Sequence, residues 1–188
     1  MDSDTQAVEH KRIFLALWPD ETTRQQLFEL QKKLKRDPEL RSVLQSARAV
    51  IPDNLHITLH FIGSVSVELM QALEICLDSV RSKPFEMVVN TTGCFPKPRV
   101  FWSGLKDIPP ELKELEQQTA ACVQLCLEDY QRIPYRPHIT LFRKAKTSLV
   151  LEGLAEINWR VKSFALVESK THPEGVQYHV LKEWPLLL

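Results

Sequence analysis

The word His-Ile-Thr-Leu occurs twice in the chain, at residues 56–59 and again at 138–141. Side chains on a β-strand alternate between its two faces, so in each copy the His and the Thr share one face while the Ile and the Leu share the other. The pattern predicts two strands that bury Ile and Leu and present His and Thr to an open surface. If these strands lie side by side, two imidazoles and two hydroxyls surround one cavity.

Two imidazoles are suited to general acid–base chemistry on a phosphodiester. The ordinary pKa of a histidine is about 6.5, so near neutral pH one ring can accept a proton while another donates one. Each such transfer typically contributes about 10²- to 10⁴-fold in rate. Thr58 and Thr140 lie about 6.6 Å along the strand from His56 and His138, close enough to hydrogen-bond the oxygens of the same phosphate. We therefore predict that these four residues open a phosphodiester without a metal ion.

Arg143 follows the second copy and offers a cation for the phosphoryl oxygens. On a regular strand, however, its side chain points away from the face that carries His138. Either the strand bulges or ends after Leu141, which would turn Arg143 toward the site, or Arg143 has a structural role; of these we favour the bulge. Phe61 is the corresponding residue of the first copy, so the two flanks are not identical.

His60 lies on the same face as His56 if the first strand is regular. It has two interpretations of equal weight, a substrate contact in the cleft or a residue of the rim or of an interface. The spacing of four residues between His56 and His60 suits a metal pair only on a helix, and no HExxH glutamate accompanies it. With 5 Gly in the chain and no phosphate-cradling glycine loop, we expect neither a metal nor a cofactor.

Basic side chains gather near the second copy, with aromatic rings between them. The basic residues are Arg132, Arg136, Arg143, Lys144 and Lys146, with Lys97 and Arg99 in a proline-rich turn, and the aromatic residues are Tyr135, Phe142 and Trp102. Such a cluster is most often a solvated charged surface. Beside a phosphate site it favours contact with nucleic acid, where the rings stack on bases.

Length and composition are those of an ordinary globular protein. The 188 residues suffice for one domain or two small lobes with a shared core, and a chain with 44% hydrophobic and 26% charged residues is not expected to be disordered. The net charge of +0 confines any nucleic-acid site to local basic patches. No apolar run approaches the roughly 18 residues of a membrane span. Residues 1–11 are polar and acidic and lack the core of a signal peptide, so we expect a disordered leader on a cytoplasmic protein.

The four cysteines show no metal-binding pattern. Cys76, Cys94, Cys122 and Cys126 form no CxxC pair, and no histidine lies at a zinc-finger spacing. Cys122 and Cys126 are four residues apart on an expected helix, where small apolar side chains commonly face a core. Without an export signal, we expect reduced thiols.

Strands and helices alternate along the chain. We expect strands at 12–18, 49–51, 56–63, 85–94, 100–105, 138–141, 160–168 and 176–184, and helices after Asp20 (ending before Asp37-Pro38), after Ser66 (buried at Leu69, Leu73, Cys76 and Val80), after Asp107 and at 148–157. Each half contains a strand, a helix and one copy of the repeated word. The predicted fold is therefore α+β, with two related lobes whose antiparallel sheets face a central cleft and whose helices lie on the outside.

The chain resembles the 2H phosphoesterase superfamily, which is named for two His-x-Thr-x motifs. It is most similar to the RNA 2′,3′-cyclic phosphodiesterases, also called 2′-5′ RNA ligases. The resemblance covers nearly the whole chain, with the segments RIFLALWPD, LHITLHFIG, RVFWSGL, RPHITLFR and the closing LVES and YHVLKEWPL. The acidic leader before Arg12 departs from the pattern of the family.

The resemblance implies a bilobal fold with pseudo-twofold symmetry and a reaction without metal or cofactor. It implies hydrolysis of a 2′,3′-cyclic phosphate at an RNA 3′ end to leave a 2′-phosphate. By motif position, His56 is the proton donor to the departing 3′ oxygen and His138 is the proton acceptor that activates water. Thr58, Thr140 and Arg143 bind the phosphate. The residues by themselves do not decide which imidazole is the acid.

Two functions are compatible with these features. The first is a cyclic phosphodiesterase in which residues 12–188 form one bilobal domain, a cytoplasmic monomer without membrane contact that acts on RNA 3′ ends or small cyclic nucleotides, with reversible 2′-5′ ligation as a second direction of the reaction. The alternative is a non-catalytic RNA or nucleotide-binding protein that uses the same cleft. The presence of both histidines and both threonines favours the enzyme, because a binding protein does not need a paired acid and base.

Overall fold

The computed structural model describes residues 9–146, 156–173 and 175–187. In this part of the chain the strands are β1 (His10–Leu17), β2 (Arg48–Ala49), β3 (Ile57–Ser66), β4 (Phe85–Val89), β5 (Thr91–Phe95), β6 (Val100–Gly104), β7 (His138–Arg143), β8 (Ile157–Val161), β9 (Ser163–His172) and β10 (Gly175–Pro185), and the helices are α1 (Glu21–Arg36), α2 (Arg41–Leu44), α3 (Val67–Leu77) and α4 (Pro110–Cys126), with a 3₁₀ turn η1 (Pro52–Asn54). No helix among the described residues is both long and apolar enough to cross a membrane.

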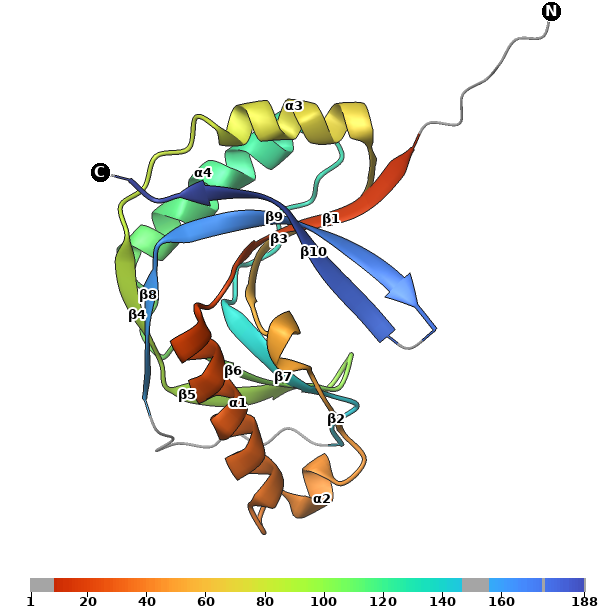
Figure 1. Ribbon diagram of the computed structural model, residues 1–188, viewed down its shortest axis with the longest axis vertical. Coiled ribbons are helices and arrows are strands. Elements are labelled where there is room, and N and C mark those ends of the chain that lie inside the picture. The colour runs from red at the N-terminus through yellow and green to blue at the C-terminus, as the bar shows by residue number, and fades with distance from the viewer. Residues whose placement is uncertain (1–8, 147–155, 174, 188) are drawn as a thin grey trace, which may run out of the picture.

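The two halves of the main antiparallel sheet join at β3 and β7, the strands that carry the repeated word. The main sheet has the order β10-β9-β1-β3-β7-β6-β5, with β2 also paired to β7, while β4 and β8 form a separate two-stranded sheet. Strands β3 and β7 are neighbours through the pair Ile57 and Ile139 (Figure 1). The predicted α+β class with antiparallel sheets is confirmed. The sheets of the two halves are hydrogen-bonded to each other at this one pair.

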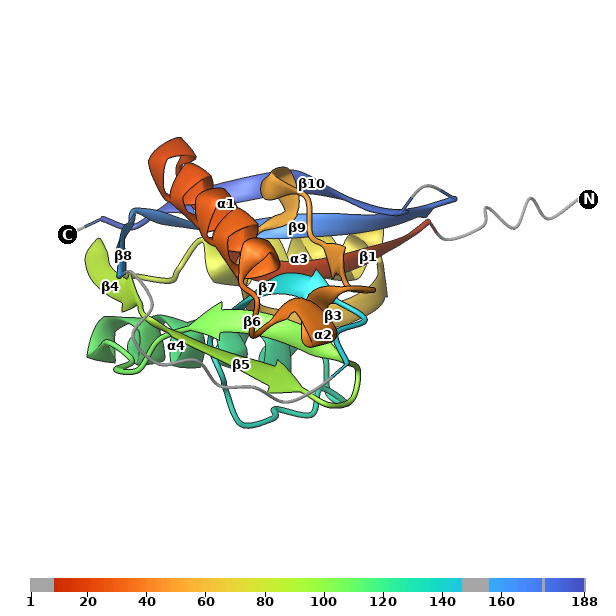
Figure 2. The ribbon, with the colours of Figure 1, turned by 90° about the horizontal axis from the view of Figure 1, so that it is seen from below.

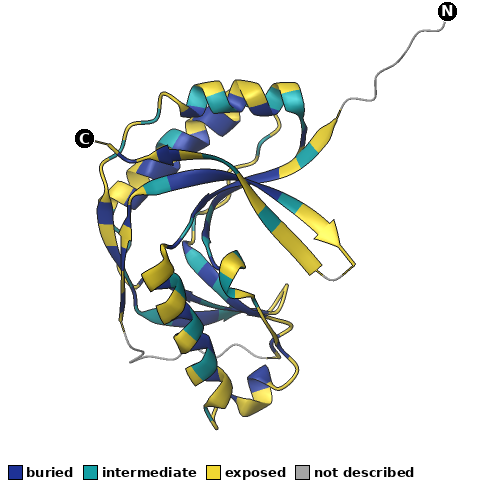
Figure 3. Cartoon of the chain, viewed as in Figure 1, coloured by how far each residue is buried: buried dark blue, intermediate teal, exposed yellow. Residues whose placement is uncertain are grey.

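The helices lie in two groups. Figures 1 and 2 show α3 and α4 side by side near β1 and β3, whereas α1 and α2 lie near β2 and β7. Helix α1 begins as predicted, because the backbone N–H of Thr23 donates to Oδ1 of Asp20 at 2.8 Å. Each long helix has a buried and an exposed side (Figure 3), and in α1 the buried side includes Leu27, Leu30 and Leu34, the stripe expected from their spacing.

Helix α3 begins as predicted but is rotated from the predicted stripe. Its cap is Ser66, whose hydroxyl accepts from the N–H of Leu69 at 3.3 Å. The buried residues, however, are Met70, Leu73 and Leu77, so three of the four predicted positions are only partly buried. The reason is that α3 packs on both β3 and α4, and the two contacts together select a different side of the helix.

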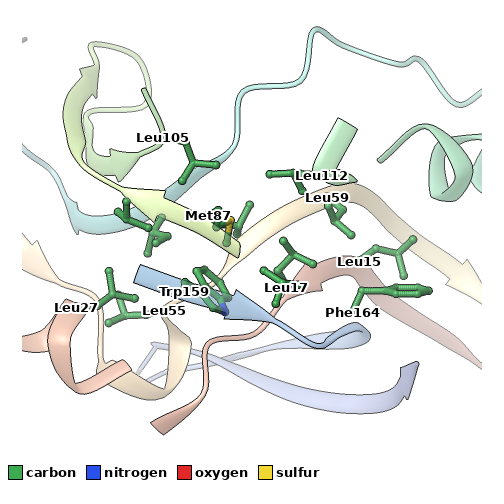
Figure 4. Close-up of a cluster of buried hydrophobic side chains, with 14 of the residues drawn as sticks. Leu15, Leu17, Leu27, Leu55, Leu59, Met87, Leu105, Leu112, Trp159 and Phe164 are labelled. Atoms are coloured by element: carbon green, nitrogen blue, oxygen red, sulfur yellow. The ribbon is translucent and has the colours of Figure 1, made fainter. Parts of the chain in front are cut away.

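Strand β1 is buried on both faces, as its apolar sequence predicts. Ile13, Leu15 and Leu17 enter the main core together with residues from α1, β3, β4 and β8 (Figure 4). Phe14 and Ala16 enter a second, smaller cluster with Ala165 and Val167, against which Trp18 and Tyr178 pack. Burial of one such large apolar side chain contributes about 1.5–3 kcal/mol. This second cluster is important for the site, because it lies on the face of the sheet that carries His56.

Several predicted boundaries are wrong. Strand β1 begins at His10, so residues 10 and 11 belong to the sheet and not to a leader. Residues 1–8 and most of the helix predicted at 148–157 lie outside the described residues, and Ile157 begins strand β8. The strand predicted at 85–94 is divided at Asn90, and the one at 160–168 is divided at Lys162. In both cases the divided strand joins two different sheets, which local sequence does not indicate.

The expectation of reduced thiols is wrong for two cysteines. Cys76 of α3 and Cys122 of α4 form a disulfide with a Cα–Cα distance of 5.6 Å. The predicted helices did not indicate that these two positions would face each other. Cys94 and Cys126 are free. Burial raises the pKa of both thiols, so neither is activated as a nucleophile.

Replacing Cys76 by serine is expected to lower the free energy of unfolding by about 4 kcal/mol. The crosslink spans a sequence separation of 46 residues and removes loop-closure entropy from the unfolded chain. Urea unfolding with and without reducing agent measures the effect. Cys126→Ser is the matched control, because that cysteine is free and lies on α4, the helix of Cys122. A wild-type stability that does not respond to the reducing agent would contradict this prediction.

Candidate active site

The register of β3 and β7 brings the four predicted residues to one place. Because Ile57 pairs with Ile139 in an antiparallel arrangement, His56 lies opposite Thr140 and Thr58 lies opposite His138. Opposite side chains in such a pair are about 5 Å apart at Cβ. The four residues are therefore brought together, but the prediction of one shared cavity is not met, because His56, Thr58 and Thr140 line one hollow while Thr58 and His138 line another.

Two hollows flank this position and share Thr58 and Phe61. The His56 hollow, about 390 Å³, is lined by Arg12, Phe14, His56, Thr58, Phe61, Thr140, Arg143, Ser169, Thr171, Val176 and Tyr178. The His138 hollow, about 440 Å³, is lined mainly by aromatic and apolar residues around His138, including Phe61, Phe95, Ile133, Pro134 and Tyr135. The first hollow is cationic and hydroxyl-rich, whereas the second is largely apolar.

Strand β7 has the bulge that was expected from the position of Arg143. Trp102 pairs with Thr140 and Phe101 pairs with Phe142, so Leu141 is the extra residue. Phe142 is consequently buried, and Arg143 lies in the His56 hollow.

Gln31 of α1 hydrogen-bonds to the backbone of this bulge. The buried Gln31 donates its Nε2–H to the carbonyl oxygens of Leu141 at 2.7 Å and of Val50 at 3.0 Å. Leu141 also accepts from the N–H of Val50 at 2.9 Å. The carbonyl of the extra residue thus has partners although its strand pairing is interrupted. Gln31 was missed in the sequence, and its signal was a polar residue beside the apolar stripe of α1.

Strand β3 has a second bulge that was not predicted. Ala16 pairs with Thr58 while Leu15 pairs with His60, so Leu59 is the extra residue. His60 therefore turns away from the face of His56 and is 3% exposed. Phe61 takes the position on the site face and is 52% exposed.

His60 is held by protein groups at both ring nitrogens. Its Nε2 donates toward the carbonyl of Glu116 and lies near Oγ1 of Thr119, both at 3.0 Å, and its Nδ1 lies 3.0 Å from the hydroxyl of Tyr130. Burial is the main cause that lowers the pKa of His60. The interpretation of His60 as a rim or interface residue is wrong, because the side chain is buried and ties β3 to α4. His60 does border the His138 hollow, so a contact with substrate there stays a prediction.

Backbone carbonyls select the tautomer of both candidate histidines. Nδ1 of His56 donates to the carbonyl of Asn54 at 2.8 Å, and Nδ1 of His138 donates to the carbonyl of Arg136 at 2.7 Å. A carbonyl only accepts, so each neutral ring carries its proton on Nδ1 and leaves Nε2 as the reactive atom. Nε2 of His56 lies 3.1 Å from the hydroxyl of Thr58. A neutral ring is then a base at Nε2, and a charged ring is an acid there.

Burial lowers the pKa values of both imidazoles, and aromatic rings are part of what buries them. Trp18 stacks on His56 with ring centroids 5.2 Å apart and planes at 3°, and Tyr178 meets it edge-on at 5.2 Å. Burial lowers the pKa of His56 to about 4, and the charges of Arg143 and His138 contribute in the same direction. Burial also lowers the pKa of His138, again with a contribution from Arg143. In the free protein at neutral pH both rings are therefore neutral, and the charge of a bound anion favours proton uptake by one of them.

We expect kcat/KM for a phosphodiester substrate to follow a bell whose limbs both lie below about pH 6.5. These limbs report the free protein, where one imidazole must be charged and the other neutral, and the lowered pKa values of His56 and His138 move them to acid pH. The negative charge of a bound phosphate raises both pKa values, so the bell for kcat lies at higher pH. Initial rates across the range test this. A kcat/KM optimum above about pH 7 contradicts it.

The basic and aromatic cluster is only partly available to a ligand. Phe142 is 1% exposed and does not stack on a base. The ring of Trp102 covers Gly93, where a Cβ atom would lie 2.2 Å from Cζ2 of the ring. Arg132 is paired with both carboxylate oxygens of the buried Glu116. Tyr135, by contrast, lines the His138 hollow together with Lys97 and Arg136.

The rings around His56 were missed in the sequence. Phe14 and Trp18 come from β1 and its end, and Tyr178 comes from β10, a separation of more than half the chain. Arg12, whose guanidinium lies 5.0 Å from the ring centroid of Phe61, was also missed. The sequence predicted β1 only as an apolar strand. No pattern of neighbouring residues indicated that this strand would lie near Tyr178.

Comparison with known proteins agrees with this geometry. The profile of the LigT-like phosphoesterase family matches residues 17–102. The RNA 2′,3′-cyclic phosphodiesterase of Thermus thermophilus is 33% identical over 186 residues, which cover 93% of this chain and 90% of that protein. The protein of the same name from Escherichia coli is 32% identical over 146 residues, which cover 76% of this chain and 81% of that protein.

Solved structures show the same fold. Escherichia coli LigT in its apo form superposes with a TM-score of 0.81 at 28% identity, with 96% of this chain and 99% of that chain covered. LigT in complex with 3′-AMP superposes with a TM-score of 0.82 at 27% identity, with 96% and 100% covered. The Thermus thermophilus protein TT0787 superposes with a TM-score of 0.75 at 30% identity, with 93% and 97% covered.

Proposed function

Because the chain belongs to the LigT-like phosphoesterase family, we propose that it is an enzyme that hydrolyses RNA 2′,3′-cyclic phosphate ends to 2′-phosphomonoesters. The observation that carries the proposal is the antiparallel pairing of the two His-Ile-Thr-Leu words at Ile57 and Ile139. That pairing supports one phosphate bound between two imidazoles whose Nε2 atoms are both available for proton transfer.

In the proposed reaction His138 is the base and His56 is the acid. Water attacks the phosphorus while Nε2 of His138 takes its proton, and the bond between phosphorus and O3′ breaks. O3′ receives the proton from Nε2 of the charged His56, so the product is a 2′-phosphomonoester and a free 3′ hydroxyl. Thr58, Thr140 and Arg143 hold the phosphoryl oxygens. The assignment of acid and base follows the family resemblance, and neither step uses a metal or a cofactor.

The size of the His138 hollow supports reversible 2′-5′ ligation as part of the proposal. A water molecule occupies about 30 Å³ of liquid volume, whereas this hollow has about 440 Å³ and aromatic walls. A nucleoside with a 5′ hydroxyl therefore has room on the side of the proposed base. When its hydroxyl replaces water, the same proton transfers give a 2′,5′-phosphodiester.

The test is incubation of an RNA oligonucleotide that ends in a 2′,3′-cyclic phosphate, with EDTA present. We expect a 2′-phosphomonoester as the product. Loss of activity with the chelator would contradict the proposed chemistry. Tight binding of the product without any turnover would instead indicate an RNA-binding protein.

We also propose that β1 to β10 form a single bilobal domain that acts as a monomer in the cytoplasm. The sheet that runs through both halves supports one domain.

Light scattering on the purified protein tests whether it is a monomer. The cytosol keeps thiols reduced, so alkylation in intact cells tests the location. Cys76 and Cys122 that resist alkylation would point to an oxidising compartment.

A further inference from the structure

The proton-transfer groups of the site have approximate twofold symmetry. Each imidazole donates Nδ1–H to the carbonyl two residues before it, at 2.8 Å for His56 and 2.7 Å for His138. Each strand also has an extra residue at the leucine of the repeated word, although β3 has another at Ile62 that β7 lacks. Two histidines and two threonines arranged in this way present nearly the same groups to both sides of a bound phosphate.

Symmetric groups do not select one product from a 2′,3′-cyclic phosphate. Both ester oxygens belong to one ribose, and either can leave when water attacks the phosphorus. Departure of O3′ gives a 2′-phosphomonoester, and departure of O2′ gives a 3′-phosphomonoester. Because the attacking and leaving oxygens lie in line, the product depends on which ester oxygen faces the proton donor. The orientation of the nucleoside must therefore be set by residues that break the symmetry.

The symmetry is broken at the fifth residue after each histidine, which is Phe61 in β3 and Arg143 in β7. The two bulges place both side chains on the site face. Arg143 lines the His56 hollow only, whereas Phe61 lines both hollows and is 52% exposed. The guanidinium of Arg12 lies 5.0 Å from the ring centroid of Phe61, so this ring is held in place by a cation–π contact.

We propose that Phe61 is a specificity-determining residue that selects the departing ester oxygen by giving the nucleobase a stacking surface where symmetry would place a second phosphate-binding cation. The inference rests on the proposed hydrolysis of 2′,3′-cyclic phosphates. Aromatic rings bind the faces of all bases, and a guanidinium binds phosphoryl oxygens. With the ring bordering both hollows and the cation confined to the His56 hollow, the ribose has one preferred orientation between His56 and His138. With arginine at both positions, the two orientations become similar.

The test compares the wild-type protein with Phe61→Arg and with the exchange variant Phe61→Arg/Arg143→Phe. Each hydrolyses a short RNA with a 2′,3′-cyclic phosphate end, and chromatography separates the 2′- and 3′-phosphate products after subtraction of a sample without protein. We expect Phe61→Arg to lower the ratio of 2′ to 3′ product about tenfold. We expect the exchange variant to form mainly the 3′ product.

Two further variants distinguish the effect of the aromatic ring from the effect of an apolar side chain. They also keep the inference testable if the arginine variant is inactive. Phe61→Leu stays apolar without a ring, and we expect its product ratio to fall as well. Phe61→Tyr keeps the ring, and its ratio should equal that of the wild type. An unchanged ratio in active Phe61→Leu overturns the inference, whatever the arginine variant does, and leaves the hydrolysis itself intact. A wild-type protein that forms no phosphomonoester overturns the proposed function instead.

Discussion

Replacing His56 or His138 by alanine is expected to lower kcat for a 2′,3′-cyclic-phosphate substrate by about 10²- to 10⁴-fold, the usual contribution of one general acid or base. Each variant removes an imidazole whose Nδ1–H is held by a backbone carbonyl, which leaves Nε2 for proton transfer. The double variant should be little worse than the poorer single variant, because residues that act as a unit are not additive. Single-turnover rates separate this loss from any change in binding.

His179→Ala is the matched control for these variants. It lies on β10, is exposed and does not line either hollow. Its activity should equal that of the wild type. Activity that survives in both His56→Ala and His138→Ala would refute the paired mechanism. Unfolding curves must accompany the rates, since His56 packs against Trp18.

Replacing Arg143 by methionine is expected to lower kcat/KM by about 10²- to 10³-fold, the typical loss when one donor to a developing oxyanion is removed. The pH profile should move as well. The positive charge of Arg143 lowers the pKa values of His56 and His138, so its removal raises both. Both limbs of the kcat/KM bell therefore shift to higher pH, and rate measurements across the pH range detect this shift.

Two variants test the cause of that shift. Arg143→Lys keeps the charge but loses the forked donor, so its bell should stay near the wild-type position while its rate falls. Arg48→Met removes an arginine on the neighbouring strand β2, opposite Arg143. It should leave the bell in place. A bell that does not move in Arg143→Met would mean that the charge of Arg143 does not act on the imidazoles.

Much of the site was predictable from the repeated word. Strand alternation is a local property, so the common face of His56 and Thr58, and of His138 and Thr140, followed from the sequence. The bulge at Leu141 was also predictable, because a regular strand would have turned Arg143 away from a phosphate that it was expected to bind. The caps at Asp20 and Ser66 were predictable for the same local reason.

The second bulge was not predictable, and it reverses the roles of two residues. His60 was expected on the site face, but the extra residue Leu59 turns it into the interior and brings Phe61 to the surface. The reason is tertiary, since His60 is held by Glu116, Thr119 and Tyr130. These residues lie at sequence separations of 56 to 70 from His60.

The sequence by itself thus determined which side chains share a strand face and which chemistry they can perform. Only the tertiary structure decided the pKa values of those side chains and which distant residues contact one another. The rings of Trp18 and Tyr178 lower the pKa of His56, and the meeting of α3 with α4 allows the disulfide between Cys76 and Cys122. Alternation along a strand depends on neighbouring residues alone. Burial, register and facing helices depend on residues that are distant in sequence and become neighbours only when the chain has folded.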